Sequence, residues 1–208
     1  MQTKGVLVVV SGFSGAGKGT VMKALLNKYD NYALSVSATT RNPRPGEENG
    51  REYFFLTESQ FEDMIKNDEL IEHARYVDHY YGTPKKYVEE KMAAGKDVIL
   101  EIEIQGALNI KKKFPDALLV FIVPPTAEDL KERLTGRGTE SAEVIEKRLR
   151  RAAEESDGMD SYDYIVVNDD IDTCVEDLHS LIRSSHFKES ANTDLVARMK
   201  QELHDMTK

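Results

Sequence analysis

The sequence has little of what secreted and membrane proteins depend on. Its 208 residues include one cysteine, Cys174, and no tryptophan, so no disulfide can form within the chain and a disulfide-stapled scaffold is excluded. The longest apolar runs, residues 5–10 and 117–125, are far shorter than the ~20 residues of a membrane-spanning helix. The first residues show no apolar stretch followed by a small-residue cleavage site. We therefore expect a cytoplasmic protein with no membrane partner.

The chain also lacks an excess of positive charge. Lysine and arginine number 28 against 37 aspartates and glutamates, which gives a formal net charge of −9. Nucleic-acid affinity comes largely from neutralising phosphates, so we expect no nucleic-acid partner. The arginines nevertheless fall into groups, at Arg41 and Arg44, Arg133 and Arg137, and Arg148, Arg150 and Arg151. Such local basic groups suit a small polyphosphate ligand, although charge runs are also common on solvated faces.

Apolar strand-like runs alternate with helical patterns over most of the chain. The runs are continuous rather than alternating, as expected for strands buried on both faces of a parallel sheet; they lie at residues 6–10, 98–102, 118–123 and 164–167. Helical patterns separate them, up to residue 29 and at residues 107–114, 127–135, 142–155 and 173–184. This alternation predicts the α/β fold class, with a parallel sheet joined by right-handed crossovers.

Residues 37–94 interrupt that alternation. Strand-like runs at 35–40, 53–56 and 70–76 surround a helix that opens with the capping box of Thr57 and Gln60. A second helix at 84–94 ends before Gly95. The pattern predicts an α+β lobe inserted into the core, and the charged segment 135–156 predicts a short helical lid. The expected single domain therefore comprises a core at 1–36, 95–134 and 157–186, a lobe at 37–94, a lid at 135–156 and a helical tail at 187–208.

A glycine-rich loop lies between the first predicted strand and the first predicted helix. Its sequence from residue 12 to residue 20 is GFSGAGKGT, in the strand–loop–helix context that phosphate-binding loops require. The glycines let backbone N–H groups point inward at phosphates, and Lys18 can reach the outer phosphates of ATP. A glycine-rich turn that binds nothing is the alternative, which Lys18 argues against. The predicted ATP contacts are Gly12, Ser14, Gly15, Ala16, Gly17, Lys18, Gly19 and Thr20.

One position departs from the usual motif. Phosphate-binding loops normally have serine or threonine directly after the lysine, as a ligand for Mg²⁺. Here Gly19 separates Lys18 from Thr20. Thr20 remains the candidate hydroxyl for the metal, but the insertion argues against a direct bond.

Several further motifs follow in a fixed order. They are SATTRNPRPGE from residue 37, GREYFF from residue 50, EHA from residue 72, YYGT from residue 80, QG from residue 105, RLTGRGT from residue 133 and ND from residue 168. Together with the phosphate loop they resemble the guanylate kinase family, from Val6 to about Ile182. The resemblance implies a P-loop NTP hydrolase-like core with a GMP-binding lobe and a lid. It also implies the reaction ATP + GMP ⇌ ADP + GDP with Mg²⁺, and dGMP as a further acceptor.

The acceptor phosphate is expected at the lobe. Arg41 and Arg44 lie three residues apart on a proline-rich turn and can bind one terminal phosphate as forks. Tyr53 and Tyr81 can donate hydroxyl groups to the same phosphate, and the family places all four there. An Arg-x-x-Arg pair alone would be read as a solvated turn.

The guanine base offers two adjacent donors, N1–H and the exocyclic amine, which suit one carboxylate. The family assigns this contact to the position of Glu72, with Ser37 and Thr83 nearby, and the resemblance extends to Glu103 on the guanine side. Adenine presents an acceptor at N1 and would leave Glu72 unpaired or repelled, so the site is expected to discriminate against it.

Transfer between two phosphates needs positioning and charge neutralisation rather than a general base. The expected cations are Lys18, Arg44, Arg137 and Arg148. We expect Arg133 to be held in a salt bridge and Arg150 and Arg151 to be solvated. Glu101 is the candidate carboxylate for Mg²⁺, and Asn168 is either a contact of the donor adenine or an ordinary turn residue.

Two other functions fit part of these observations. A kinase for another nucleoside monophosphate would share the phosphate loop. A non-catalytic guanylate-kinase-like module that binds phosphorylated peptides would share the arginine–tyrosine pocket, but such modules are expected to lack a working phosphate loop.

Overall fold

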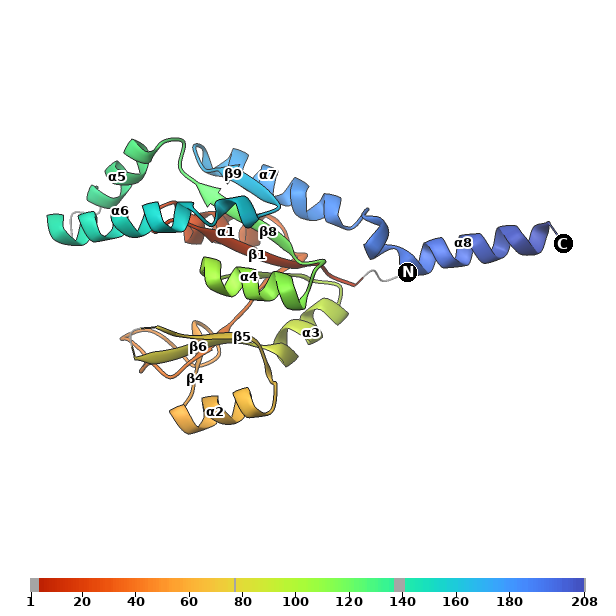
Figure 1. Cartoon of the computed structure of the whole chain (residues 1–208), viewed down its shortest axis with the longest axis horizontal. Coiled ribbons are helices and arrows are strands. Elements are labelled where there is room, and N and C mark those ends of the chain that lie inside the picture. Colours follow the sequence, from red (N-terminus) through yellow and green to blue (C-terminus); the bar gives the residue numbers. More distant parts are fainter. Residues whose placement is uncertain (1–3, 77, 137–140, 208) are drawn as a thin grey trace.

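A parallel five-stranded sheet forms the centre of the protein in the computed structural model, which describes residues 4–76, 78–136 and 141–207 (Figure 1). In spatial order its strands are β2 (Tyr32–Leu34), β7 (Asp97–Glu101), β1 (Leu7–Gly12), β8 (Leu118–Val123) and β9 (Tyr164–Val167). All four pairings are parallel, with Val9 opposite Leu100 on one side and Leu119 on the other. The carboxyl ends of these strands therefore meet at one edge of the sheet.

Helices cover both faces of this sheet. Helices α1 (Lys18–Lys28) and α7 (Ile171–Ser185) pack on one face, where Val8 and Val10 of β1 point. Helices α3 (Lys85–Ala93) and α4 (Ile104–Lys113) pack on the other, where Leu7 and Val9 of β1 point. Because both faces are covered, the strands are apolar at most positions, with Asp97 and Glu101 at the two ends of β7, and the predicted parallel α/β core is confirmed.

A second, mixed sheet lies to one side of the core. Its strand order is β4 (Tyr53–Phe55), β3 (Ser37–Thr39), β6 (His79–Pro84) and β5 (Leu70–Tyr76). Helix α2 (Glu58–Lys66) packs against this sheet through Phe61, which is fully buried. The capping box predicted at the start of α2 is present, because the Thr57 hydroxyl accepts from the Gln60 N–H and the Gln60 side chain accepts from the Thr57 N–H. The predicted α+β lobe is this sheet with its helix.

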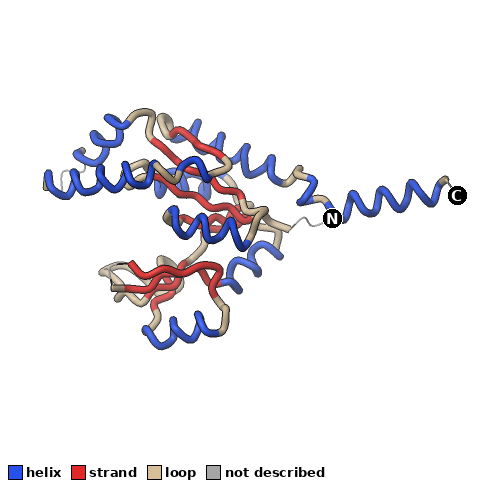
Figure 2. Tube along the Cα trace, in the orientation of Figure 1, coloured by secondary structure: helices blue, strands red, loops and turns tan. Residues whose placement is uncertain are grey.

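Three more helices complete the chain. Helix α5 (Ala127–Thr135) precedes α6 (Ala142–Ser156), which lies above the carboxyl edge of the core sheet (Figure 2). Short 3-10 turns occur at Met159–Ser161 and Glu189–Ala191, and the last helix is α8 (Thr193–Met206). Helix α8 buries none of its residues and projects away from the rest of the molecule (Figure 1). None of the helices in the described part of the chain is both long and apolar enough to cross a bilayer.

Two predicted boundaries were wrong, and one strand was not predicted. Residues 35–40 do not form one strand, because the chain leaves the core sheet after Leu34 and joins the lobe sheet at Ser37. Strand β6 was not predicted, since its sequence HYYGTP lacks the alternation of polar and apolar residues and contains glycine and proline. Helix α4 starts at Ile104 rather than at residue 107, and Gly106 is accommodated inside its first turn.

Candidate active site

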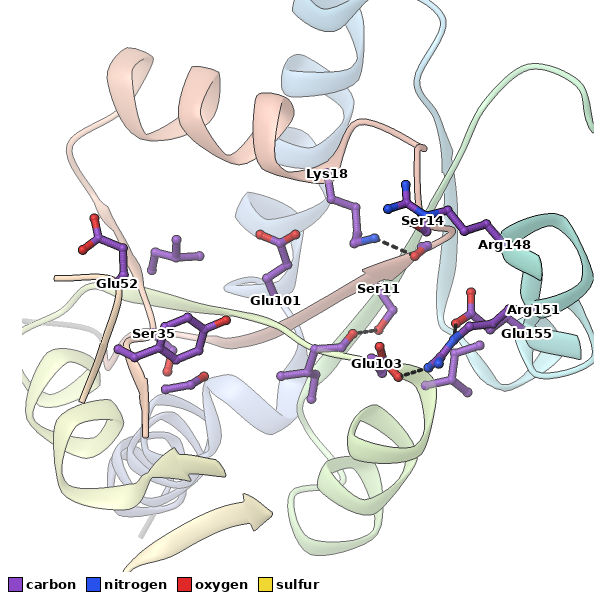
Figure 3. A pocket seen from close by; sticks show the side chains of 16 residues that line it. Ser11, Ser14, Lys18, Ser35, Glu52, Glu101, Glu103, Arg148, Arg151 and Glu155 are labelled. Atoms are coloured by element: carbon purple, nitrogen blue, oxygen red, sulfur yellow. Dashed lines mark hydrogen bonds and ion pairs between the residues drawn. The ribbon is translucent and has the colours of Figure 1, made fainter. Parts of the chain in front are cut away.

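A cavity of about 570 Å³ opens at the carboxyl edge of the core sheet. Its walls come from the ends of β1 and β7, from β3 and β4 of the lobe, and from helix α6, as Figure 3 shows. Ligands of open parallel α/β sheets bind at this edge, where loops leave the strands. The cavity is therefore the candidate site, and it joins the core, the lobe and α6.

The glycine-rich loop forms the core side of this cavity. Strand β1 ends at Gly12 and helix α1 begins at Lys18, so the loop bends between a buried strand and a helix N-terminus. Gly15 and Gly17 adopt φ angles of 96° and 89°, which side chains with a Cβ rarely adopt. Gly12, Ser14 and Lys18 line the cavity, as predicted for a phosphate-binding loop. The loop thus bends through two left-handed glycines at the edge of the cavity.

The remaining loop residues occupy different environments. Ala16 is fully buried beneath the loop and Gly15 packs against Leu134 of α5. Gly19 and Thr20 are exposed on the first turn of α1. The Thr20 N–H already donates to the Gly17 carbonyl at 3.0 Å, whereas the N–H groups of Lys18 and Gly19 belong to the first positions of the helix, which have no partner within it and can serve an anion.

Lys18 folds back over the loop. Its Nζ donates to the carbonyl oxygens of Gly12 at 2.6 Å and Phe13 at 3.2 Å. Burial lowers the pKa of Lys18 below its usual value, and the nearby carboxylates of Glu101, Glu155 and Glu103 act in the opposite direction. Lys18 therefore presents a partly buried positive charge at the cavity wall, compensated by two carbonyl oxygens and nearby carboxylates.

Asn168 braces the loop from below. Its side chain is buried, and Nδ2 donates to the Ala16 carbonyl at 2.8 Å. A Cβ on Gly17 would lie 2.4 Å from this Nδ2 atom, so the glycine and the asparagine fit together closely. The carbonyl oxygen of Asn168 accepts a 2.8 Å hydrogen bond from Nη2 of Arg133. Arg133 was expected to be held in a salt bridge, and it is held by this main-chain carbonyl instead.

Arg41 and Arg44, the two arginines predicted to bind the acceptor phosphate, lie around one glutamate to which the sequence analysis assigned no role. Nη2 of Arg41 lies 2.9 Å from both carboxylate oxygens of Glu47, and the Arg44 N–H donates to Glu47 Oε2 at 2.7 Å. The Arg44 N–H bond, followed by the Arg41 guanidinium, lowers the pKa of Glu47. Glu47 therefore stays ionised and fixes the turn that carries both arginines. Glu47 follows Arg44 by three residues on the same proline-rich turn, and this spacing could have indicated the contact.

Aromatic rings continue this cluster toward the cavity. The Arg41 guanidinium carbon lies 5.4 Å from the ring centre of Tyr53, whose ring meets that of Tyr81 edge-on at 6.1 Å. Tyr53 and Ser37 line the cavity, whereas Arg44 is exposed on its turn. The structure thus brings together Arg41, Tyr53 and Tyr81.

The carboxylate predicted to bind guanine is buried in the lobe. Glu72 is 8% exposed, and the fully buried Thr83 hydroxyl donates to its Oε1 at 2.8 Å. A Cβ on Gly106 of α4 would lie 3.3 Å from Glu72 Oε2, so the missing side chain of this glycine leaves room for the carboxylate. Burial raises the pKa of Glu72, while the Thr83 hydrogen bond and Lys113 oppose the shift. Burial destabilises the ionised carboxylate of Glu72, and a polar ligand that hydrogen-bonds to it would offset this cost.

Helix α6 presents charged side chains to the cavity from above. Arg148, Arg151 and Glu155 all line it, and the Arg148 side chain extends toward Ser14 and Lys18 (Figure 3). Nε of Arg151 lies 2.9 Å from Glu155 Oε1, and its Nη2 pairs with Glu103 Oε2. Arg137, the other predicted cation of this segment, lies outside the described residues.

The prediction for Arg151 was wrong. It was grouped with Arg150 as solvated, but only Arg150 fits that description, in an exposed pair with Glu146 at 3.1 Å. Residues 148, 151 and 155 recur at the spacing of one helical face, and this period could have identified Arg151 from the sequence.

Of the two candidate metal partners, Glu101 lines the same cavity and Thr20 is exposed on α1. Glu101 ends β7, lines the cavity and lies beside Lys18 (Figure 3). Within the residues that the structure describes, no group of three or more histidine, cysteine, aspartate or glutamate side chains is placed to hold a metal ion. One carboxylate beside a phosphate-binding loop fits Mg²⁺, which keeps several waters and takes one or two carboxylates together with substrate phosphates.

Comparison with known proteins agrees with this geometry. A family model described as guanylate kinase matches residues 4–185. The guanylate kinase of Caldanaerobacter subterraneus subsp. tengcongensis is 47% identical over 97% of this chain and 98% of its own length, and that of Lactococcus lactis subsp. lactis is 50% identical over 90% and 92%. The crystal structure of guanylate kinase from Anaplasma phagocytophilum superposes with a TM-score of 0.71 at 32% identity, covering 90% of this chain and 89% of that one. The chain belongs to the guanylate kinase family.

Proposed function

We propose that the chain transfers the terminal phosphoryl group of ATP to GMP, yielding ADP and GDP. The observation that carries this proposal is that one cavity is lined both by the phosphate loop, through Gly12, Ser14 and Lys18, and by the lobe, through Ser37 and Tyr53. Two phosphate-bearing ligands can therefore meet in it. Membership of the guanylate kinase family supports the identity of the acceptor.

The donor nucleotide is proposed to bind at the loop. The N–H groups of Gly15, Gly17 and the first turn of α1 would surround the β- and γ-phosphates, and the Lys18 ammonium would exchange its carbonyl contacts for phosphate oxygens. Asn168, which braces the loop through Ala16, is proposed to lie near the donor adenine as well.

The acceptor nucleotide is proposed to bind at the lobe. Arg41 and Arg44 would hold its phosphate together with the hydroxyls of Tyr53 and Tyr81. Glu47 supports this arrangement, because it restrains the guanidinium of Arg41 and the main chain at Arg44 before a ligand arrives. Pre-arranged donors lose less conformational entropy on binding.

The base is proposed to be read by Glu72. Its carboxylate would accept from guanine N1–H and from the exocyclic amine, with Ser37, Thr83 and Glu103 nearby. The Thr83 hydroxyl already orients Glu72. Adenine would place an acceptor against this buried carboxylate, so the site would reject AMP.

The transfer itself is proposed to need no general base. An oxygen of the GMP phosphate attacks the γ-phosphorus, the bond from that phosphorus to the β,γ-bridging oxygen breaks, and ADP leaves. Lys18, Arg44, Arg148 and Arg137 would offset the charge on the transferring group as the segment 135–156 closes as a lid.

Mg²⁺ fits the donor set around the loop. Glu101 would hold the ion together with phosphate oxygens and water, with Thr20 as a further candidate, and the bound ion would supply charge neutralisation on the β- and γ-phosphates. We place this reaction in the cytoplasm, which agrees with a chain that has one cysteine and depends on no internal disulfide.

An acceptor panel tests this function. ADP release from ATP and Mg²⁺ would be measured with GMP, dGMP, AMP, UMP and CMP, each over a range of concentrations. GMP should accelerate ADP release well above the rate without acceptor, and AMP should not. Equal rates with GMP and AMP would contradict the role of Glu72, and no acceleration by GMP would overturn the proposed function.

A further inference from the structure

Arg151 joins two carboxylates that come from different parts of the chain. Its Nε lies 2.9 Å from Glu155 Oε1, one helical turn further along α6, and its Nη2 pairs with Glu103 Oε2, 48 residues away in sequence. Figure 3 shows the guanidinium between the two glutamates at the wall of the cavity. This chain of three charges connects α6 to the start of α4.

Glu103 has little else to hold its side chain in one orientation. It is the N-cap residue of α4, with φ −78° and ψ 162°, but its carboxylate makes no capping bond to its own helix. The side chain is 64% exposed, and an exposed glutamate has three rotatable bonds whose restriction costs about 1.5–2 kcal/mol. The arginine contact therefore decides where this carboxylate points.

Arg151 itself is restrained from the opposite side. Glu155 is 20% exposed at the cavity wall, and the guanidinium presents several donors in one rigid plane, so it can bind two carboxylates at once. A half-exposed ion pair adds little to stability. The arrangement therefore orients the Glu103 carboxylate and contributes little to the stability of the fold.

We propose that Arg151 is a positioning residue for base recognition: it holds the Glu103 carboxylate toward the exocyclic amine of guanine. A carboxylate offers about four acceptor sites, so Glu103 can accept from Arg151 and from the amine together. This inference rests on the proposed function, in which Glu103 lies on the guanine side. Arg151 does not touch the reacting atoms, and it acts through Glu103.

Inosine 5′-monophosphate separates this role from a general structural one, because it is GMP without the exocyclic amine. We would measure the dissociation constants of GMP and of inosine monophosphate by titration calorimetry, with the full chain and without ATP. Arg151→Ala should raise the dissociation constant of GMP about three- to tenfold, the effect of one lost or misdirected hydrogen bond. It should leave the dissociation constant of inosine monophosphate within about twofold. For Arg151→Lys, the dissociation constant of GMP should lie between those of the unsubstituted chain and of Arg151→Ala, since lysine retains the charge but lacks the planar fork.

Arg150→Ala is the matched control, because Arg150 is the neighbouring arginine and pairs only along the exposed side of α6 with Glu146. It should leave both dissociation constants unchanged. The affinity for ATP, measured in parallel, reports any displacement of α6, because Arg148 lies on the same helix beside the phosphate loop.

Each result has a defined meaning. Equal weakening of GMP and inosine monophosphate in Arg151→Ala, or an equal loss of ATP affinity, would overturn the proposal in favour of a structural role for Arg151. Tighter GMP binding would overturn it as well, because Arg151 would then compete with the base. Glu103→Gln distinguishes the role of Arg151 from the assignment of Glu103 to guanine. If Glu103→Gln lowers the preference for GMP over inosine monophosphate while Arg151→Ala does not, only the role of Arg151 fails. If Glu103→Gln leaves the preference unchanged, the assignment of Glu103 to guanine fails with it.

Discussion

The hydroxyl of Thr83 donates a 2.8 Å hydrogen bond to Oε1 of Glu72, and neither side chain is more than 8% exposed. The two residues lie on adjacent antiparallel strands of the lobe, β6 and β5, which hold this contact in a fixed geometry. The bond leaves Oε2 of Glu72 on the side of Gly106. A small ligand can therefore meet a carboxylate whose direction is already set.

Replacing Thr83 by valine should weaken base recognition. The substitution keeps the volume but removes the hydroxyl that orients Glu72, so the kcat/KM for GMP should fall about three- to tenfold, mainly through KM. Steady-state kinetics at saturating ATP would measure the change. Thr83→Ser retains the hydroxyl and should stay close to the unsubstituted enzyme; an equal loss in both variants would show that the methyl group matters and the hydrogen bond does not.

Glu72 should reduce stability in the absence of ligand, in a manner that depends on pH. Burial raises its pKa above the ordinary value of 4.5, so folding favours the protonated form. This contribution is fully present below pH 4.5 and is lost as the pH rises through the raised pKa. Glu72→Gln does not titrate and should unfold at a higher temperature than the unsubstituted chain at pH 7, while losing activity toward GMP.

The stability gain of Glu72→Gln should shrink toward zero as the pH falls to 4.5, and calorimetry at several pH values would follow it. Glu62→Gln on the exposed surface of α2 serves as the control and should show no such trend. A Glu72→Gln variant that is less stable than the parent at pH 7 would mean that the ionised carboxylate is well paired without ligand.

Asn168 should matter for the donor nucleotide. Asn168→Ala removes the bond to the Ala16 carbonyl and leaves that buried oxygen unpaired, so the free energy of unfolding should fall by about 1–3 kcal/mol. The phosphate loop should also loosen, and the KM for ATP should rise more than the KM for GMP. Asn192 makes comparable side-chain bonds to the carbonyls of His186 and Lys188 in the tail. Asn192→Ala should leave both KM values unchanged, and an equal effect from the two variants would argue against a specific role in bracing the loop.

Helix α8 should be dispensable for catalysis. It buries none of its residues, and the tail is anchored before it by His186, whose Nε2 lies 2.8 Å from Oδ1 of the buried Asp97. A chain that ends at Asn192 should keep kcat and both KM values within about twofold, as is usual for changes remote from a site. A loss of more than tenfold, with an unchanged circular dichroism spectrum for the remainder, would show that α8 contributes to the site.

The core could be predicted from the sequence because its signals are local. Strand Leu118–Val123 is a six-residue apolar run, and helix Ala127–Thr135 begins with a Thr126 cap whose side chain accepts from the Asp129 N–H. Both elements were predicted with their observed bounds. The phosphate loop could be predicted equally well, since its signal is a set of glycines and a lysine close together in the sequence.

The lobe was harder to predict because its contacts join distant residues. Strand β6 is defined by its pairing with β3 and β5 rather than by its own composition. Two side-chain bonds join residues far apart in the chain: Arg151 to Glu103 over 48 residues, and Arg133 to the Asn168 carbonyl over 35 residues. No periodicity of the sequence indicates these contacts. Such side-chain partners depend on the tertiary arrangement of the helices.

The most direct test of the proposed transfer is to quantify both products, by ion-exchange chromatography of ATP, GMP and Mg²⁺ incubated with the protein. We predict that ADP and GDP form in equal amounts. Lys18→Met should abolish both products because it removes the cation at the transferring phosphate, while the dissociation constant of GMP in the separate lobe stays within about twofold. ADP formed without GDP, or GDP formed at an undiminished rate by Lys18→Met, would contradict phosphoryl transfer at this loop.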